Sequence, residues 1–401
     1  MSSQADAPPP PSAAGEKKRL PRVALLIETS NAYARGLLRG IEAYVREHRA
    51  WSIYLVEHGR GDAPPRWLHG WDGNGIIARI ENKTIARGLE PLKVPVVDVS
   101  AACLIPSVPY VETDDAAIAE LAATHFMERG FKSFAFCGDP RFEWANQREM
   151  HFARIIRDRG RACFIHRPAI GTPPEEDAFI DELGTLVAKL PKPLAVFACY
   201  DFRGRQVLEA CRRRGLAVPE EVAVLGVDDD DVLCNLAPVP MSSIKPNTLR
   251  TGYEAAALLE RMMSGERVAG TAHLIPPIGV VTRQSTDVTA ADDVHVAQAA
   301  RFIRENACSG IGVGAVVAAV PMARRVLERR FRAMLGRTLR EEISRVQMQR
   351  VKELLVGTAL PLAEIASRVG YKHVEYLTFA FKRECGVPPS AYRQQRGSSH
   401  G

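Results

Sequence analysis

The sequence lacks the patterns that mark secreted, metal-binding and membrane-spanning proteins. Its eight cysteines are scattered and none forms a C-x-x-C pair, which predicts reduced thiols in a cytoplasmic protein, without a disulfide framework or a metal site. No apolar run reaches the roughly 18 residues that a membrane span needs, so we expect no membrane contact. Residues 1–20 are rich in proline, serine and alanine and have no apolar core, which predicts a disordered leader rather than a secretory signal.

Common catalytic motifs are missing too. The sequence contains no P-loop, no G-x-S-x-G or H-E-x-x-H motif and no Cys/His catalytic grouping. The glycine-rich stretch 70–75 does not open a helix after a strand, so it indicates a turn. We therefore expect a protein that is not an enzyme and needs no cofactor. A sugar-modifying enzyme is kept as an alternative, which sugar turnover would reveal.

Acidic residues are scarce in the last quarter of the chain. Residues 291–401 contain 18 Lys/Arg and 10 Asp/Glu, a net charge of +8, whereas the remaining 35 basic and 37 acidic residues give −2. This concentration of positive charge indicates contact with a polyanion such as DNA, although a solvated basic face would have the same composition.

Short apolar strands alternate with helices through the first two thirds of the sequence. Such an alternation predicts parallel sheets covered by helices on both faces, and its length favours two α/β lobes over one small sheet. We expect strands at 23–27, 75–78, 94–99, 134–137, 195–198 and 222–227, and helices at 31–47, 114–129, 147–159 and 203–214.

The strand pattern stops after a polar segment at 284–293, which we interpret as a linker. The following residues predict an all-α domain at 294–396 and a disordered tail at 397–401. Its expected helices are 294–306, 315–320, 323–334, 339–356, 362–368 and 374–385.

Two helix-turn-helix patterns lie in this domain. In the second, Gly370 makes the turn and the next helix buries Leu377 and Phe381. In the first, Leu327 and Phe331 form the inner face of the second helix. The outer faces carry side chains suited to guanine, cytosine or phosphate, and we expect DNA contacts from Arg324, Arg325, Glu328, Arg329, Lys372, His373, Glu375, Thr378 and Phe379.

The domain resembles the AraC/XylS family of transcription regulators. The resemblance is carried by Ile365-Ala366, Val369-Gly370-Tyr371, Tyr376-Leu377, Phe381-Lys382, Gly386, Pro388-Pro389 and Tyr392-Arg393, with 327–332 and Gly336 in the first unit. It implies two recognition helices, joined by the long helix 339–356, in adjacent major-groove segments. Pro321 and Ala323 replace the usual glycine and serine cap, and Phe379 stands at an often basic position, which suggests contact with a thymine methyl group.

The segment 21–283 resembles the LacI-type sugar-binding fold, a two-lobed fold shared with periplasmic sugar-binding proteins. The matching features are the opening strand and helix, 111–115, 222–229, and Pro276-Pro277 leading to 283–287. A LacI-type sensor followed by an AraC-type domain resembles the XylR-like, D-xylose-responsive members of the AraC family. That resemblance implies a homodimeric activator of sugar catabolism genes that binds operator DNA, a monosaccharide such as D-xylose, and RNA polymerase.

The resemblance also implies sugar contacts from Arg148 and Asp228, which match a sugar-binding arginine and carboxylate of LacI-type proteins. Trp144 is expected to stack on the sugar ring. Strand ends bind ligands in α/β clefts, which adds Asn31, Tyr33, Asp98, Tyr200 and Asp201. Asn31 could instead only cap its helix, and a ligand-independent DNA-binding protein with a degenerate pocket remains an alternative.

Overall fold

The structure is a computed structural model that describes residues 20–57, 59–60, 62–168, 176–287, 293–358 and 360–397. The expected leader, except Leu20, and the last four residues of the expected tail lie outside these ranges. The chain divides into two compact units, with the boundary between Asp287 and Val288. No helix in the described ranges is long and apolar enough to cross a membrane.

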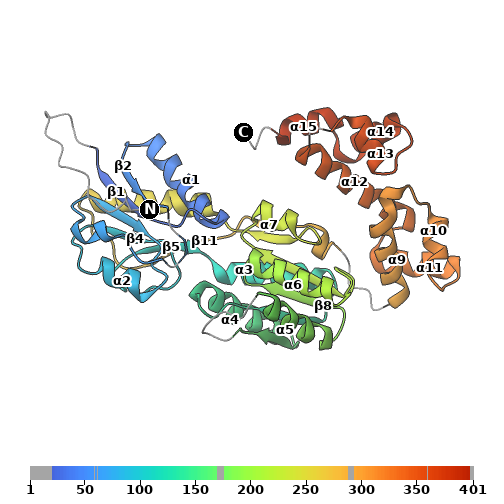
Figure 1. The fold of residues 1–401 in the computed structure, drawn as a ribbon, viewed down its shortest axis with the longest axis horizontal. Coiled ribbons are helices and arrows are strands. Elements are labelled where there is room, and N and C mark those ends of the chain that lie inside the picture. Colours follow the sequence, from blue (N-terminus) through green and yellow to red (C-terminus); the bar gives the residue numbers. More distant parts are fainter. Residues whose placement is uncertain are drawn as a thin grey trace. The chain divides into compact units, whose positions relative to one another are not determined.

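The first lobe of the N-terminal unit is a six-stranded parallel sheet with strand order β11-β5-β4-β3-β1-β2. Alternate residues of β1 face two separate cores, one under α1 and α8 and the other under α2 and η1, and Figure 1 shows α1 and α2 on opposite sides of the strands. The elements are β1 (Arg22–Leu26), α1 (Ala32–Glu47), β2 (Ser52–Leu55), η1 (Arg66–Gly70), β3 (Gly75–Ala78), α2 (Lys83–Leu89), β4 (Val96–Asp98), β5 (Tyr110–Thr113), α8 (Thr248–Met263) and β11 (Ala272–Ile275).

Glycines allow α1 and α8 to pack with their backbones in contact. A Cβ atom on Gly40 would lie 2.1 Å from the carbonyl oxygen of Leu249, and one on Gly252 would lie 2.0 Å from that of Leu37. Any larger residue at either position would push the helices apart. This contact fastens α8, which comes late in the sequence, to the lobe built by the first residues.

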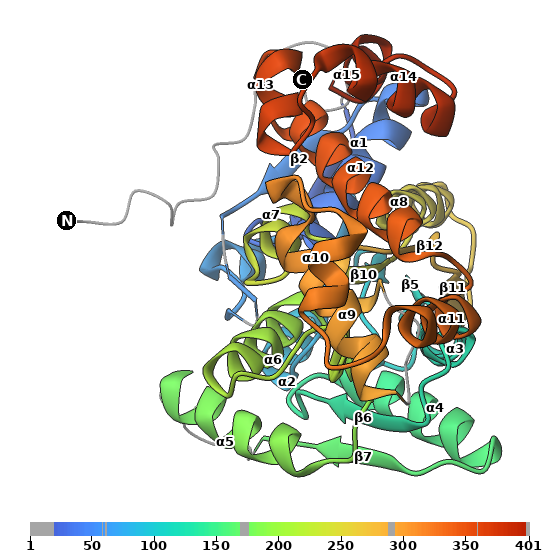
Figure 2. The same ribbon diagram turned by 90° about the vertical axis from the view of Figure 1, so that its right-hand side faces the viewer.

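The second lobe is also six-stranded, with order β12-β10-β9-β8-β6-β7, and only β12 is antiparallel to its neighbour. Figure 2 shows α5 and α6 on one side of β6, and α3 and α4 on the other. The elements are α3 (Asp115–Glu128), β6 (Ser133–Cys137), α4 (Glu143–Asp158), β7 (Cys163–His166), α5 (Glu176–Lys189), β8 (Leu194–Ala198), α6 (Asp201–Arg213), β9 (Val222–Val227), α7 (Asp231–Leu236), β10 (Ser242–Lys245), β12 (Gly279–Val281) and η2 (Gln284–Thr286).

Three short segments connect the lobes, after β5, after β10 and after β11. Backbone hydrogen bonds tie them together: the Asp114 N–H donates to Ile275 O (2.9 Å), and the Ile278 N–H donates to Lys245 O (2.8 Å). The expectation of two α/β lobes is therefore confirmed, with the added feature that the chain returns to the first lobe before it ends in the second.

The end of the second lobe differs from the expected boundary at residue 283. Residues 284–286, which the polar composition placed in the linker, form η2 with Ser285 and Thr286 fully buried. Ser285 Oγ donates to Val224 O (2.6 Å), and Thr286 Oγ1 lies 2.7 Å from His125 Nε2. Polar residues that are buried with hydrogen-bond partners inside a lobe have the same composition as a linker, so the sequence alone does not distinguish the two. Residues 288–292 of the expected linker lie outside the described ranges.

The C-terminal unit is all-α, as expected. Its elements are α9 (Val294–Asn306), η3 (Ala307–Ser309), α10 (Val313–Ala318), α11 (Arg324–Leu335), α12 (Leu339–Gly357), α13 (Leu362–Arg368), α14 (Val374–Cys385) and α15 (Pro389–Gly397). Figure 2 shows α12 running from the α9–α11 group to the α13–α15 group, and each group has its own apolar core. The amide of Gln347, midway along α12, donates to Ala307 O (3.0 Å) and Val369 O (2.9 Å), which joins the two groups.

Candidate functional site

A cleft of about 460 Å³ lies between the two lobes of the N-terminal unit. It opens at the carboxyl ends of β1, β8 and β9, where α/β folds bind ligands, and its size suits a small molecule. One group of lining residues comes from the first lobe and the other from the second: Ser30, Asn31, Ala32, Arg35 and Arg60, and then Tyr200, Asp201, Phe202, Asp228, Asp230, Val232 and Leu233.

Asp228 follows β9 directly and has a strained backbone. Its φ of 114° lies in a region that residues other than glycine rarely adopt, at a cost of about 1–3 kcal/mol. Its N–H donates to Ile244 O (3.0 Å), but its carboxylate forms no hydrogen bond with any described residue. Burial raises the pKa of this carboxyl, against the positive charges of Arg148 and Arg60. Asp228 is thus a strained acceptor whose hydrogen-bonding capacity is left unused at the cleft surface.

Asp201 and Tyr200 begin α6 and also line the cleft. The buried Asp201 carboxylate accepts hydrogen bonds from the Asp230 N–H (2.8 Å), Ser243 Oγ (2.6 Å) and Cys234 Sγ (3.4 Å). These bonds tie α6 to α7 and β10. Burial, helped by the negative charge of Asp228, raises the pKa of Asp201 well above its usual value. Asp201 therefore holds the cleft wall in place, and its sugar contact stays a prediction.

Arg148 and Trp144, both on α4, are not among the residues that line the cleft. Arg148 is 3% exposed; its Nε donates to Asp115 Oδ1 and its Nη1 to Cys199 O, both at 2.7 Å. The Trp144 ring stacks on Phe142 and lies 4.9 Å from the Arg148 guanidinium. Arg148 thus positions the backbone just before Tyr200. Its direct contact with a ligand remains a prediction, and so does stacking by Trp144.

Of the other predicted sugar-binding residues, one lines the cleft and two are buried away from it. Asn31 lines the cleft and caps α1, because its Oδ1 accepts the Ala34 N–H (2.8 Å). Tyr33 is buried and donates its hydroxyl to Glu112 Oε1 (2.6 Å). Asp98 is buried and accepts the Ile80 N–H (3.1 Å), and burial raises its pKa to about 7. Neither Tyr33 nor Asp98 is among the lining residues, so a sugar contact from either also remains a prediction.

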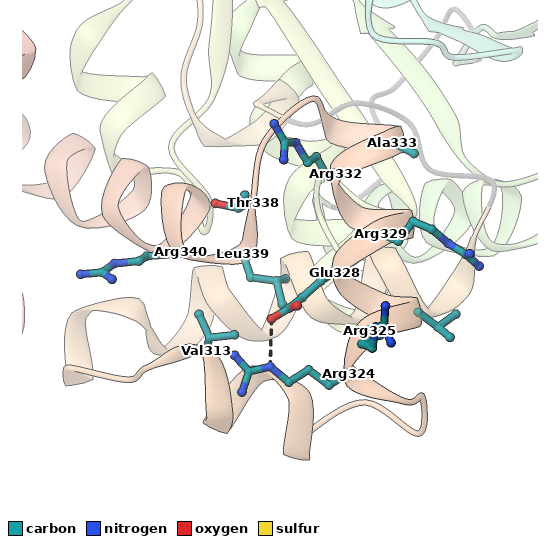
Figure 3. Close-up of a pocket in the computed structure, with 11 residues that line it drawn as sticks. Val313, Arg324, Arg325, Glu328, Arg329, Arg332, Ala333, Thr338, Leu339 and Arg340 are labelled. Atoms are coloured by element: carbon teal, nitrogen blue, oxygen red, sulfur yellow. Dashed lines mark hydrogen bonds and ion pairs between the residues drawn. The ribbon is translucent and has the colours of Figure 1, made fainter.

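In the C-terminal unit, the outer face of α11 lines a basic groove of about 1000 Å³ (Figure 3). Arg324 Nε donates to Glu328 Oε1 (3.0 Å), whereas Arg325 and Arg329 are exposed and form no ion pair with any described residue. The groove also includes Arg332, near the end of α11, and Arg340, at the start of α12, two arginines that the sequence analysis missed. Five arginines against one glutamate make this surface suitable for a polyanion.

The recognition helix of the second unit is less basic. Lys372 and His373 are exposed just before α14, and Glu375 is exposed in its first turn. Phe379 is 68% exposed. Thr378 is partly satisfied by its own helix, since its Oγ1 donates to Val374 O (2.9 Å). The two units therefore offer different chemistry, one mainly charged and the other with an exposed aromatic ring.

Comparisons with known proteins match both units. Family models match at residues 22–116 (XylR N-terminal domain), 123–286 (periplasmic binding protein-like domain) and 316–395 (helix-turn-helix domain). The xylose operon regulatory protein of Escherichia coli K12 is 31% identical over 380 residues, which cover 93% of this chain and 96% of that protein. The chain belongs to the XylR family. The corresponding protein of Haemophilus influenzae is 30% identical over 383 residues, covering 93% and 98%.

Solved structures agree with this assignment. A structure of the xylose-binding transcription activator XylR is 30% identical, covers 94% of this chain and 99% of its own, and has a TM-score of 0.80. A cellobiose complex of the regulator CelR, 22% identical, covers 66% of this chain and 84% of its own with a TM-score of 0.56, which shows the fold alone. As a member of the XylR family, this chain is a transcription regulator and not an enzyme.

Several lining residues of this XylR family member have no clear signal in the sequence. Arg60 lies in the loop after β2, a strand that the sequence analysis did not predict, and Arg35 lies on the first turns of α1. An arginine in a loop usually indicates only solvent exposure.

Within the described ranges, no group of three or more His, Cys, Asp or Glu side chains is placed to hold a metal ion.

Proposed function

We propose that this protein is a cytoplasmic transcription activator of sugar catabolism genes, controlled by a monosaccharide such as D-xylose that binds in the cleft between its lobes. The observation that carries the proposal is the state of Asp228. Its strained backbone and unused carboxylate lie in an inter-lobe cleft of a chain that matches xylose operon regulators over nearly its whole length. A sugar hydroxyl would satisfy that carboxylate with a charge-assisted hydrogen bond.

Closure of the lobes would convert binding into a signal. A sugar held by residues of both lobes favours the closed arrangement, and only by its difference in affinity for the two arrangements. The three short connections between the lobes limit the motion to a hinge. In a homodimer, closure would change the spacing of the two C-terminal units, and with it the operator spacing that they fit.

On DNA, the two recognition helices would read different features. The α11 arginines suit phosphates and guanine, and contacts from Arg324, Arg325, Glu328 and Arg329 are proposed there. Lys372, His373, Glu375, Thr378 and Phe379 are proposed for the second unit, with Phe379 against a thymine methyl group. RNA polymerase is proposed as the partner that the bound activator recruits.

A thermal-shift screen of the full chain against pentoses and hexoses tests this function. We expect D-xylose, or another sugar of the panel, to raise the unfolding temperature of the sensor, because a ligand at a hundred times its Kd contributes about 2.7 kcal/mol. The sugar should be recovered unchanged, since a sensor does not consume it. Failure of every sugar to shift the melt would contradict sugar control and favour the ligand-independent alternative.

A further inference from the structure

The side chain of Arg60 is incompletely satisfied at the cleft. It is 19% exposed, yet its Nε is buried and has no hydrogen-bond partner among the described residues. Its nearest acid is Glu28, whose Oε1 lies 3.5 Å from Nε. That oxygen already accepts hydrogen bonds from Arg79 Nη1 and Asn31 Nδ2. A carboxylate oxygen has two lone pairs, so Glu28 Oε1 has no capacity left for Arg60.

Three aromatic rings of the second lobe surround the Arg60 guanidinium. Its central carbon lies 5.2 Å from the ring of Phe142, 5.4 Å from that of Trp144 and 5.7 Å from that of Tyr200. These distances are typical of cation–π contacts. Because Arg60 belongs to the first lobe, the same side chain that lines the cleft also links the two lobes.

Asp228 of the second lobe lines the same cleft with a carboxylate that forms no hydrogen bond with any described residue. An unsatisfied buried donor and an unsatisfied acceptor in one cleft are costly to leave unpaired. A hydroxyl can accept from a guanidinium while it donates to a carboxylate. A neutral polyol with adjacent hydroxyl groups is therefore the class of ligand that suits this donor and this acceptor.

We propose that Arg60 binds the sugar by donating a hydrogen bond to one of its hydroxyl groups, opposite Asp228. Through its contacts with the rings of Phe142, Trp144 and Tyr200, the same side chain connects the bound sugar to the second lobe. The proposal rests on the proposed function. It assigns to Arg60 the role of the cleft arginine, while Arg148 keeps its bonds to Asp115 and Cys199.

The test is calorimetric titration of the full chain and of Arg60→Lys with D-xylose and its monodeoxy analogues. Lysine keeps the charge but lacks Nε and the planar face. The control is Arg66→Lys, an exposed arginine of the neighbouring η1 that does not line the cleft. We expect Arg60→Lys to weaken D-xylose binding by about ten- to a hundredfold, the range for a hydrogen bond to a charged group, and Arg66→Lys to bind like the parent.

The monodeoxy analogues distinguish direct contact between Arg60 and a sugar hydroxyl from indirect support of the cleft by Arg60. If Arg60 touches one hydroxyl, the parent discriminates against the analogue that lacks it, and Arg60→Lys loses that discrimination at this position alone. An equal loss for all analogues, or unchanged affinity, would overturn the role of Arg60 and leave the proposed function intact. If the parent binds neither D-xylose nor any other sugar of the thermal-shift panel, the proposed function itself is refuted, and the sugar role of Arg60 with it.

Discussion

Replacing Asp228 by glycine and by alanine should separate the strain at this residue from its chemistry. Both variants lack the carboxylate, so the cost of burying it disappears equally from each. Only glycine adopts a φ of 114° without steric cost. Glycine also makes the unfolded chain more flexible than alanine does, which lowers stability by about 0.4–1 kcal/mol. Subtracting this from a strain of about 1–3 kcal/mol, we expect Asp228→Gly to exceed Asp228→Ala in free energy of unfolding by up to about 2.5 kcal/mol.

The assay is scanning calorimetry of the full chain, with and without D-xylose, on the transition that the sugar shifts in the parent. Neither variant should respond to the sugar, because neither presents the acceptor. A glycine variant less stable than the alanine variant by about 0.4–1 kcal/mol, the difference that the unfolded chain alone produces, would show that no strain is stored at position 228. A parent-like sugar response in either variant would remove the Asp228 carboxylate from the binding site.

Three further predictions concern the recognition helix, the buried acids and the turn of the second unit. Arg329→Ala should weaken binding to a selected DNA site by about 1–3 kcal/mol and relax the preference for one base pair. The control is Arg87→Ala, an exposed arginine of α2, which should leave the binding-site selection profile unchanged. If the two profiles are identical, α11 contacts only the DNA phosphate backbone. Burial raises the pKa of Glu112 to about 7 against an ordinary 4.5, so the folded state holds the extra proton and sensor stability should fall as pH rises between these values; melts of Glu112→Gln should show a flatter pH dependence, and an unchanged slope would contradict the assignment. Gly370→Ala should destabilise the C-terminal unit more than Gly336→Ala, since both have a positive φ but only the Gly370 Cβ would meet another backbone, 2.6 Å away; equal losses in helical melts would show that the close approach is not maintained.

The alternation of apolar strands and helices predicts this fold because most of its strands are buried on both faces. β1, β3, β6, β8 and β9 stand out in the sequence as continuous apolar runs. β2 and β7 escaped prediction because they are edge strands with mixed exposure. The starts of α4 and α6 were placed too late, since neither has a side-chain N-cap to mark it.

The candidate site could be predicted from the sequence only in part. Of the residues selected because they follow strands, Asn31, Tyr200, Asp201 and Asp228 line the cleft. Tyr33 and Asp98, selected by the same rule, are buried in the lobe interior. Which way a side chain points after a strand depends on packing partners far away in the sequence. Arg60 was missed because its surroundings come from the other lobe, through rings more than eighty residues later.

The central claim is that sugar in the cleft controls DNA binding. Its most direct test is the affinity of the full chain for DNA sites selected from a random library, measured by fluorescence anisotropy at fixed salt with and without D-xylose. The account predicts that saturating D-xylose changes the affinity by roughly 5- to 150-fold, the usual range of allosteric coupling, and that Asp228→Ala, with its DNA-binding unit intact, gives the same affinity under both conditions. An affinity of the parent that does not change with D-xylose, when calorimetry shows the sugar bound, would contradict it.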